Sequence, residues 1–309
     1  MAKYILKRIL ILIPTIVGVS FIVFLLLYLS PGDAAYARAG ANAPEEVVEA
    51  LRQSMGLKDP FFVQYFRFLK GLITEFNLGT SYITGQPVSK MILSVFPNTL
   101  KLTGLALLIC TFVGILFGVI GAINRGGIID KILTVFGMIG LAMPIFWTGL
   151  ILIIIFSVRL KVLPPSGFNS FKQMIMPAAA LGFQSSAIIM RMTRSSMLEV
   201  LNQDYMNTAL AKGLKESTII FVHALKNAML PVITVIGLQM GGLLGGSVLT
   251  ETVFSIPGLG RLMVDSVKTR DYPLVLGGVI FIAISYSIIS ILVDIIYGFI
   301  DPKIKAEYK

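Results

Sequence analysis

Charged residues, histidine and cysteine are scarce in this sequence. Only 14% of the 309 residues are charged, where soluble proteins average about 25%. One cysteine and one histidine exclude a disulfide framework and argue against cysteine- or histidine-based metal sites. The sequence also lacks G-x-x-x-x-G-K-[ST], G-x-S-x-G and H-E-x-x-H, the patterns of a phosphate-binding loop, a serine nucleophile and a zinc-protease helix. We therefore predict that the chain itself is not an enzyme and binds no cofactor.

Apolar residues are abundant instead. They make up 56% of the chain, and the mean hydropathy is +0.86, which indicates an integral membrane protein. The net charge of +10 would suit a nucleic-acid partner in a soluble protein. In a membrane protein it reflects cytoplasmic loops that face anionic lipid, so no nucleic-acid partner is predicted.

Six apolar runs are long enough to cross a membrane as helices. The first, Ile9–Leu29, follows Lys3, Lys7 and Arg8 and so resembles a signal peptide. Its apolar length of about 21 residues exceeds the 7–15 of a signal peptide, and no small-residue cleavage site follows, so we predict a retained transmembrane helix. The other runs are Thr99–Ile123, Ile132–Val158, Met174–Met192, Val232–Leu249 and Leu274–Ile300. These runs predict an all-α membrane protein with six transmembrane helices.

The distribution of basic residues orients these helices. An even number of spans places both termini on one side of the membrane. With the termini inside, the cytoplasmic segments hold thirteen Lys and Arg residues and the short outer loops hold six, which favours cytoplasmic termini. Residues 1–30 then form the cytoplasmic N-terminus and first span, and residues 31–97 an extracytoplasmic region with helices near 44–55 and 61–76. The second of these helices is amphipathic and rich in aromatic residues, so we expect it either to pack on its neighbour or to lie in the bilayer interface. Residues 98–309 form a five-helix core.

The longest polar interval in the second half of the chain is Arg191–Leu230, which this orientation places in the cytoplasm. Helix-forming residues run up to Gly213, where glycine favours a left-handed helix end. A second helix is predicted over 216–228, with Pro231 opening the next span. The small residues Thr208 and Ala209 give the first helix a face that can enter a groove in another protein. An ordinary polar connector explains the same pattern equally well.

A few polar residues lie within the apolar runs. Gln184 and Gln239 are near mid-span, where an amide has to find a partner; it either joins two helices or lines a polar path. Asp294 is an acid inside the last span and is by default a functional candidate. These three are the candidates for a translocation path. A stand-alone secondary transporter or channel is the alternative class, and it usually shows more embedded charge or paired broken helices.

The interval around Gly213 resembles a known loop. Permease subunits of binding-protein-dependent ATP-binding-cassette (ABC) importers carry E-A-A, three residues, G, nine residues, then I-x-L-P. Here Ala209, Gly213 and Leu225 match that pattern, whereas the Glu, first Ala, Ile and Pro are absent. The local form A-K-G-L followed by H-A-L-x-N-A-x-L-P is similar to the dipeptide, oligopeptide and nickel branch. Further stretches resembling that branch are Tyr4–Arg8, Pro31–Asp33, Met55–Pro60, Leu78–Tyr82, Pro97–Leu100, Glu251–Gly260 and Arg270–Pro273.

The resemblance implies a type I ABC importer-like permease in a prokaryotic cell membrane. It would pair with a second homologous permease, with two cytoplasmic ATPase subunits that hold ATP and Mg²⁺, and with an extracytoplasmic substrate-binding protein. Di- or oligopeptides are the expected substrate, and nickel or glutathione are the alternatives within the branch. The residues expected to couple to the ATPases are Asn207, Thr208, Ala209, Lys212, Gly213, Leu214 and His223.

Overall fold

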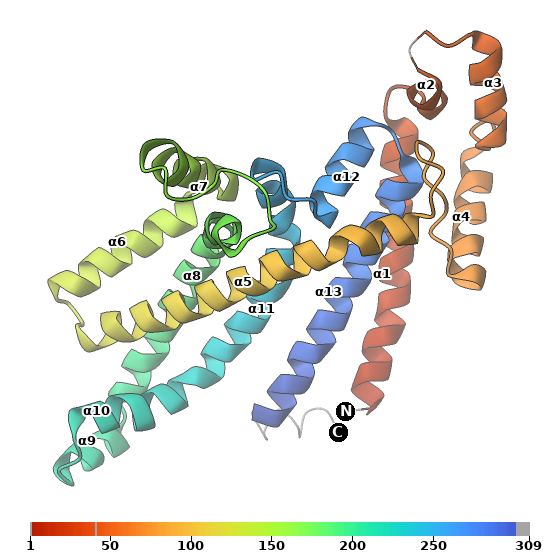
Figure 1. Ribbon diagram of the computed structural model, residues 1–309. Coiled ribbons are helices and arrows are strands. Elements are labelled where there is room, and N and C mark those ends of the chain that lie inside the picture. The colour runs from red at the N-terminus through yellow and green to blue at the C-terminus, as the bar shows by residue number, and fades with distance from the viewer. Residues whose placement is uncertain (1, 41, 301–309) are drawn as a thin grey trace. The chain divides into compact units, whose positions relative to one another are not determined.

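The structure is a computed structural model that describes residues 2–40 and 42–300, without the side chains of residues 2–9, 207, 210, 294 and 296–300. Within the described ranges the chain is helical, and the one β contact is an isolated bridge between Thr80 and Pro87. Figure 1 shows the helices in order: α1 (Ala2–Leu29), α2 (Ala34–Ala39), α3 (Glu45–Ser54), α4 (Phe61–Glu75), α5 (Val88–Ile123), α6 (Ile128–Ala142), α7 (Ile145–Leu152), the π-helical η1 (Ile153–Arg159), α8 (Phe171–Leu201), α9 (Asp204–Ala211), α10 (Glu216–Thr218), the π-helical η2 (Ile219–Ala224), α11 (Leu225–Val253), α12 (Leu259–Lys268) and α13 (Tyr272–Ile300).

The helices form two compact units. One unit contains Thr99–Ile256 and residues 289–300, and the other contains Ala2–Asn98 and Pro257–Ile288. Among the described residues, five helical stretches are long and apolar enough to cross a membrane, and a bent pair of shorter helices brings the number to six when the pair is counted as one span. With the bent pair counted as one span, the prediction of an all-α protein with six apolar spans is confirmed.

The third predicted span is not one helix. We expected Ile132–Val158 to be continuous, but Ile128–Ala142 and Ile145–Arg159 meet at 111°. The bend lies at Met143 and Pro144, where Met143 has an extended backbone with ψ of 125°. Proline disfavours helical backbone in the residue before it and lacks an N–H for the helix ladder, so the chain turns here.

Three other helices are longer than predicted. Helix α5 begins at Val88 rather than Thr99, and α8 continues past Met192 to Leu201. Helix α11 runs through Pro231, which we had placed at the start of a span. An unbroken helix satisfies main-chain groups where no water reaches them, and a proline inside it removes only one hydrogen bond. Proline is therefore a weaker stop signal in this chain than sequence reasoning assumed.

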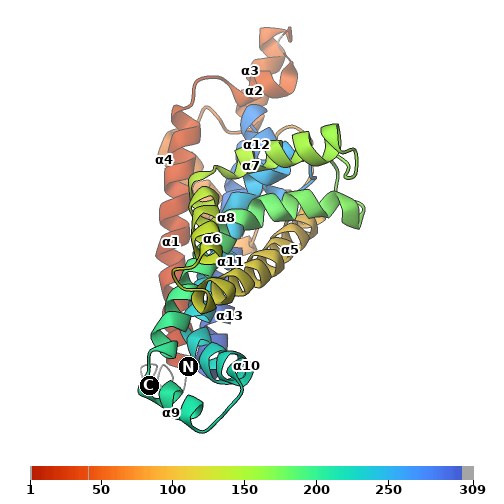
Figure 2. The same ribbon diagram turned by 90° about the vertical axis from the view of Figure 1, so that its left-hand side faces the viewer.

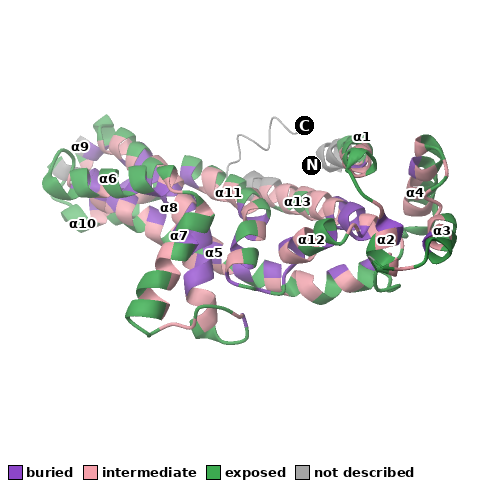
Figure 3. Cartoon of the chain, turned by 90° about the horizontal axis from the view of Figure 1, so that it is seen from above, coloured by how far each residue is buried: buried purple, intermediate pink, exposed green. Residues whose placement is uncertain are grey.

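Helix α8 is the centre of the first unit, and Figure 3 shows buried residues along it. Glycines permit its closest contacts with α5. A Cβ atom on Gly182 would lie 2.8 Å from the carbonyl oxygen of Ala106, and one on Gly118 would lie 2.4 Å from the Cβ of Thr193. Small residues at such positions let two backbones approach closely, which is how apolar helices gain contact within a membrane.

A buried ion pair fixes α6 to α8. Arg194 donates to both carboxylate oxygens of Asp130, at 2.6 and 2.7 Å. The main-chain N–H of Gly126 donates to the same carboxylate at 2.9 Å. The side chain of Asp130 is 6% exposed and that of Arg194 is 32% exposed. The pair therefore closes the turn between α5 and α6 onto α8.

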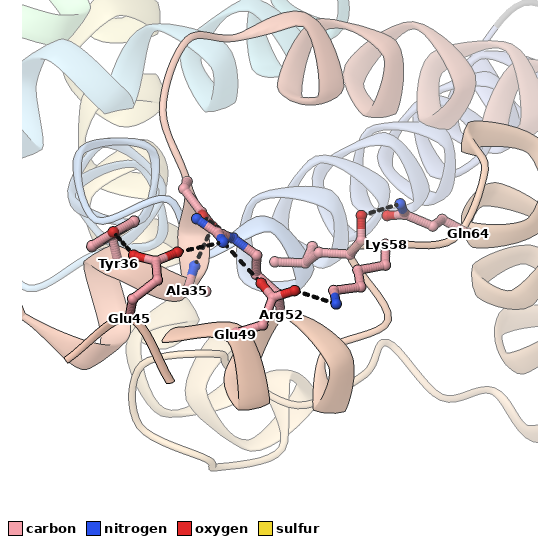
Figure 4. Close-up of polar contacts among 9 residues, drawn as sticks. Ala35, Tyr36, Glu45, Glu49, Arg52, Lys58 and Gln64 are labelled. Atoms are coloured by element: carbon pink, nitrogen blue, oxygen red, sulfur yellow. Dashed lines mark hydrogen bonds and ion pairs between the residues drawn. The ribbon is translucent and has the colours of Figure 1, made fainter. Parts of the chain in front are cut away.

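The second unit holds a charge network between α2 and α3. Arg52 donates to Asp33, Glu45 and Glu49, and Glu49 also pairs with Lys58 (Figure 4). Hydrogen bonds from Lys58 and then Arg52 lower the pKa of Glu49 below its usual 4.5. A carboxylate with a lowered folded-state pKa stabilises the fold above its unfolded pKa, and this contribution is lost as the pH falls through the lowered value.

Removing Arg194 should destabilise the first unit. Arg194→Ala leaves Asp130 buried without its guanidinium partner, and the expected loss of unfolding free energy is near the lower end of about 3–5 kcal/mol because Arg194 is partly exposed. Thermal unfolding of the detergent-solubilised protein measures this loss. The matched control is Lys268→Ala at the exposed pair with Asp265 (3.7 Å), which should cost less than about 1 kcal/mol. Equal losses for the two variants would contradict the interpretation.

Candidate coupling hairpin and polar residues within the spans

A helical hairpin joins α8 to α11. Helix α9 follows the end of α8, and α10 continues through η2 into α11 without a break. Figure 2 shows α9 and α10 together at one end of the α8 and α11 pair. Gly213 lies in the turn with φ of +77°. The predicted left-handed conformation of Gly213 is confirmed.

An apolar cluster holds the hairpin in place. Met206 of α9 and Ile219 of η2 are buried with Met197 of α8 and Val119 of α5. Between the two arms, the side-chain amide of Asn227 donates to the hydroxyl oxygen of Tyr205 at 3.0 Å. The hairpin is therefore packed against the ends of two long helices, and a force on it reaches α5 and α8 through direct contact.

The predicted coupling residues share the outer part of this hairpin. Thr208, Lys212, Gly213 and Leu214 are exposed, and His223 is partly buried on η2. The backbone of Asn207 lies in α9, but its side chain is outside what the structure describes. Ala209 departs from our expectation of a bare face, because it packs against the apolar cluster under α9.

Sequence reasoning missed two exposed apolar residues beside this turn. Phe221 and Val222 of η2 are 60% and 55% exposed. The available signal was a run of four large apolar residues, Ile219 to Val222. Adjacent residues cannot both face the same buried cluster, so at least one had to face outward. They enlarge the apolar part of the surface that the hairpin presents.

Replacing Gly213 tests whether the turn geometry matters. No atom lies within 4 Å of a Cβ added there, so the penalty of a side chain is the left-handed backbone itself, about 1–2 kcal/mol. We expect Gly213→Val to reduce substrate uptake and the amount of co-purified ATPase at normal membrane abundance. Gly213→Asn is the matched control, because asparagine tolerates this conformation and fills the same open space. Equal uptake by both variants would show that the turn does not require the left-handed residue.

The candidates for a translocation path are not brought together as a group. Gln184 and Gln239 are each partly buried, on α8 and α11. Ser185 and Gln239 lie 3.0 Å apart, with the serine hydroxyl donating to the amide oxygen of Gln239. This contact supports the interpretation that Gln239 joins two helices. The backbone of Asp294 lies in α13, and its side chain is outside the described atoms.

Sequence reasoning also missed a buried acid at the end of α11. Glu251 is fully buried in the last turn of α11, where the hydroxyl of Thr99 donates to it at 2.7 Å. Our predicted span Val232–Leu249 left Glu251 outside the helix. The apolar run ends at Leu249, and composition alone does not reveal that the helix continues with an acid turned inward.

A double-mutant cycle separates the two interpretations of Gln239. If it joins α8 to α11, Ser185→Ala and Gln239→Ala should be coupled by about 0.6 kcal/mol, the average for such bonds in a membrane helix bundle. The Gln239→Ala variant should then lower the amount of assembled protein, and uptake should fall only because less protein is assembled. Altered uptake by Gln239→Ala in a fully assembled protein, with no coupling to Ser185, would favour the path instead. Thermal stability and uptake are the two measurements.

The fold defines a helical membrane protein with an exposed hairpin between α8 and α11, and the comparisons give its family. The model described as "Binding-protein-dependent transport system inner membrane component" matches residues 114–306. Its N-terminal companion, described as "Binding-prot-dependent transport system membrane comp, N-term", matches residues 1–103. The chain belongs to this family, which makes it a multi-pass permease component of an ABC importer in the inner membrane.

Full-length relatives agree with the family. The chain is 41% identical over 313 residues to a probable peptide ABC transporter permease protein of Sinorhizobium fredii, covering 99% of this chain and 100% of the relative. It is 41% identical to a glutathione transport system permease protein of Salmonella paratyphi A, covering 99% of each chain. It is 40% identical to a di/tripeptide transport system permease protein of Pseudomonas aeruginosa, covering 99% of this chain and all of the relative.

Two groups of solved structures share the fold. A structure of the MetNI methionine ABC transporter in an inward-facing conformation superposes with a TM-score of 0.59 at 16% identity, covering 68% of this chain and 96% of that one. A crystal structure of an amino acid ABC transporter with histidines superposes with a TM-score of 0.52 at 17% identity, covering 70% of this chain and 94% of that one. At this identity the likeness concerns the fold alone. It confirms the type I importer-like arrangement expected for the chain.

Proposed function

We propose that this permease imports short peptides. The observation that carries the proposal is the agreement of its relatives, which are 40–41% identical along the whole chain and are named for peptides, di- and tripeptides or glutathione. Glutathione is itself a tripeptide, so one substrate class covers all three names. A path for such a substrate has to pass a flexible chain with charged ends.

The transport cycle requires further subunits. We propose a second homologous permease, two cytoplasmic ATPase subunits that bind ATP and Mg²⁺, and an extracytoplasmic binding protein that delivers the peptide. The excess of basic residues in the inner segments supports cytoplasmic termini. The same orientation puts the α9–α10 hairpin in the cytoplasm, where an ATPase can contact it.

The hairpin is our candidate for receiving the movement of the ATPases. Its exposed outer part offers Thr208 of α9 and Lys212 and Leu214 of the turn to a partner. Its buried side is fixed to α5 and α8, so displacement of the turn moves helices within the membrane. Exposed ion pairs contribute only about 0–1 kcal/mol, and the fit of the turn into a groove should therefore matter more than the charge of Lys212.

Reconstitution of the complete importer tests the substrate. The chain is co-expressed with its proposed partner permease, ATPases and binding protein, purified as a complex and placed in liposomes. We expect ATP-dependent uptake of a labelled dipeptide, with excess unlabelled tripeptide or glutathione competing. The same liposomes tested with Ni²⁺ provide the alternative. Uptake of Ni²⁺ without uptake of any peptide would overturn the proposal, as would peptide uptake by the chain alone.

A further inference from the structure

Helix α4 belongs to residues 31–97, which sequence reasoning placed on the extracytoplasmic side, with α4 packed on its neighbour or lying in the bilayer interface. We propose that α4 lies within the hydrocarbon core of the bilayer beside α1, and that lipid acyl chains cover its exposed apolar stripe of Phe62, Phe66 and Ile73. These three residues are 61%, 61% and 65% exposed and lie on one face of the helix. Both helices are in the same compact unit.

The first argument is the depth at which α4 contacts α1. Figures 1 and 3 show the two helices side by side. Phe61 packs on Phe24 and Tyr28 at 5.3 and 5.1 Å between ring centres. Tyr65 packs farther along α1, on Phe21 at 5.3 Å. From Phe61 to Tyr65 the contacts thus move toward the middle of α1.

The length of the apolar stretch of α1 shows how deep in the bilayer these contacts lie. Its apolar stretch Leu10–Leu29 has 20 residues, about 30 Å of helix, which is just enough to cross the hydrocarbon core. The hydroxyl of Tyr65 donates to the carbonyl oxygen of Val17 at 2.9 Å. Val17 is twelve residues from Leu29, or about 18 Å along the helix. A contact there lies inside the core and not above it.

The second argument is that the hydroxyl of Tyr65 finds its hydrogen-bond partners on α1. Its side chain is buried, and its hydroxyl lies 3.1 Å from that of Ser20 as well as on the carbonyl of Val17. A polar group that water cannot reach needs partners from the protein itself, because leaving it without one costs several kcal/mol in an apolar medium. The contact between α4 and α1 is therefore built as a dry helix–helix contact.

The third argument is the arrangement of side chains around α4. The amide of Gln64 donates to the main-chain oxygens of Leu57 and Asp59, and Arg67 pairs with Asp59. Gln64, Arg67 and Gly71 border a cavity of about 480 Å³. The apolar stripe lies on the opposite side of the helix. Gln64 and Arg67 thus lie toward the cavity while the apolar stripe faces outward, the reverse of a soluble helix for these residues, and such an exposed stripe indicates a covered surface.

The lipid-exposed surface of α1 indicates which molecules cover the apolar stripe of α4. Only 6% of the most apolar window of α1 is buried, and its outward residues Ile22 and Leu26 are 58% and 63% exposed. A spanning helix with so little protein around it has lipid as its neighbour. The stripe on α4 extends this lipid-facing surface at the same depth, which favours acyl chains over water or a protein partner.

Photo-crosslinking in the assembled importer tests the proposal. Phe66 is replaced by the photoreactive analogue benzoylphenylalanine, which has a similar ring and preserves the fold, and native membranes are irradiated. The expected result is a mass increase of one phospholipid on this chain. Leu26 of α1 is the lipid-exposed control. Ser54, exposed on α3, is the control for water and should give no lipid adduct.

Each other outcome overturns the proposal. A product that migrates as this chain joined to another subunit would show that a protein covers the stripe. Failure to form a lipid adduct at Phe66, while Leu26 forms one, would place the stripe in water. The same substitution at Phe62 gives a second reading of the stripe, in case the photoreactive group at Phe66 points away from its neighbours. The amount of chain in the membrane reports whether the variants fold.

Discussion

The structure depends on one constraint: within a membrane, every main-chain N–H and C=O has to be bonded inside the protein. This is why α5 and α11 continue through Pro97 and Pro231. Each helix loses one main-chain hydrogen bond at its proline but is not interrupted there. It also explains why the exception at Pro144 is a sharp bend between two helices and not an irregular loop. Side chains then decide how these helices pack, and glycine is the residue that brings α8 closest to α5.

Periodicity and length located most of the helices from sequence alone. The predicted helices near 44–55 and 61–76 correspond to α3 and α4, and the predicted end at Gly213 matches the turn after α9. Boundaries were less accurate. Local signals for a helix end, such as Pro231 or the polar residues after Met192, are overridden when a neighbouring helix or the membrane supplies the stabilising contacts. The short α2 was missed because its first turn depends on Asp33 accepting from the N–H of Ala35, a contact of a single side chain.

The candidate site was predictable in its place but not in its contacts. A glycine after a run of helix formers indicated the hairpin, because the backbone requirement is local. The packing of Ala209 on an apolar cluster depends on Met197 and Val119, which belong to other helices. The burial of Glu251 depends on Thr99, 152 positions earlier in the chain. Contacts across such separations leave no periodic pattern in the sequence, and only the folded chain shows them.

The bend after α6 gives this permease a built-in optical reporter. Trp147 is the only tryptophan in the sequence, and it lies in the first turn of α7, three residues beyond Pro144. Its side chain is 51% exposed, so its surroundings are set by whatever lies against the bend. Indole emission shifts with the polarity around the ring, and tyrosine contributes little at the long-wavelength edge of excitation. The intrinsic fluorescence of this subunit therefore follows a single, known point of the fold, without any added dye.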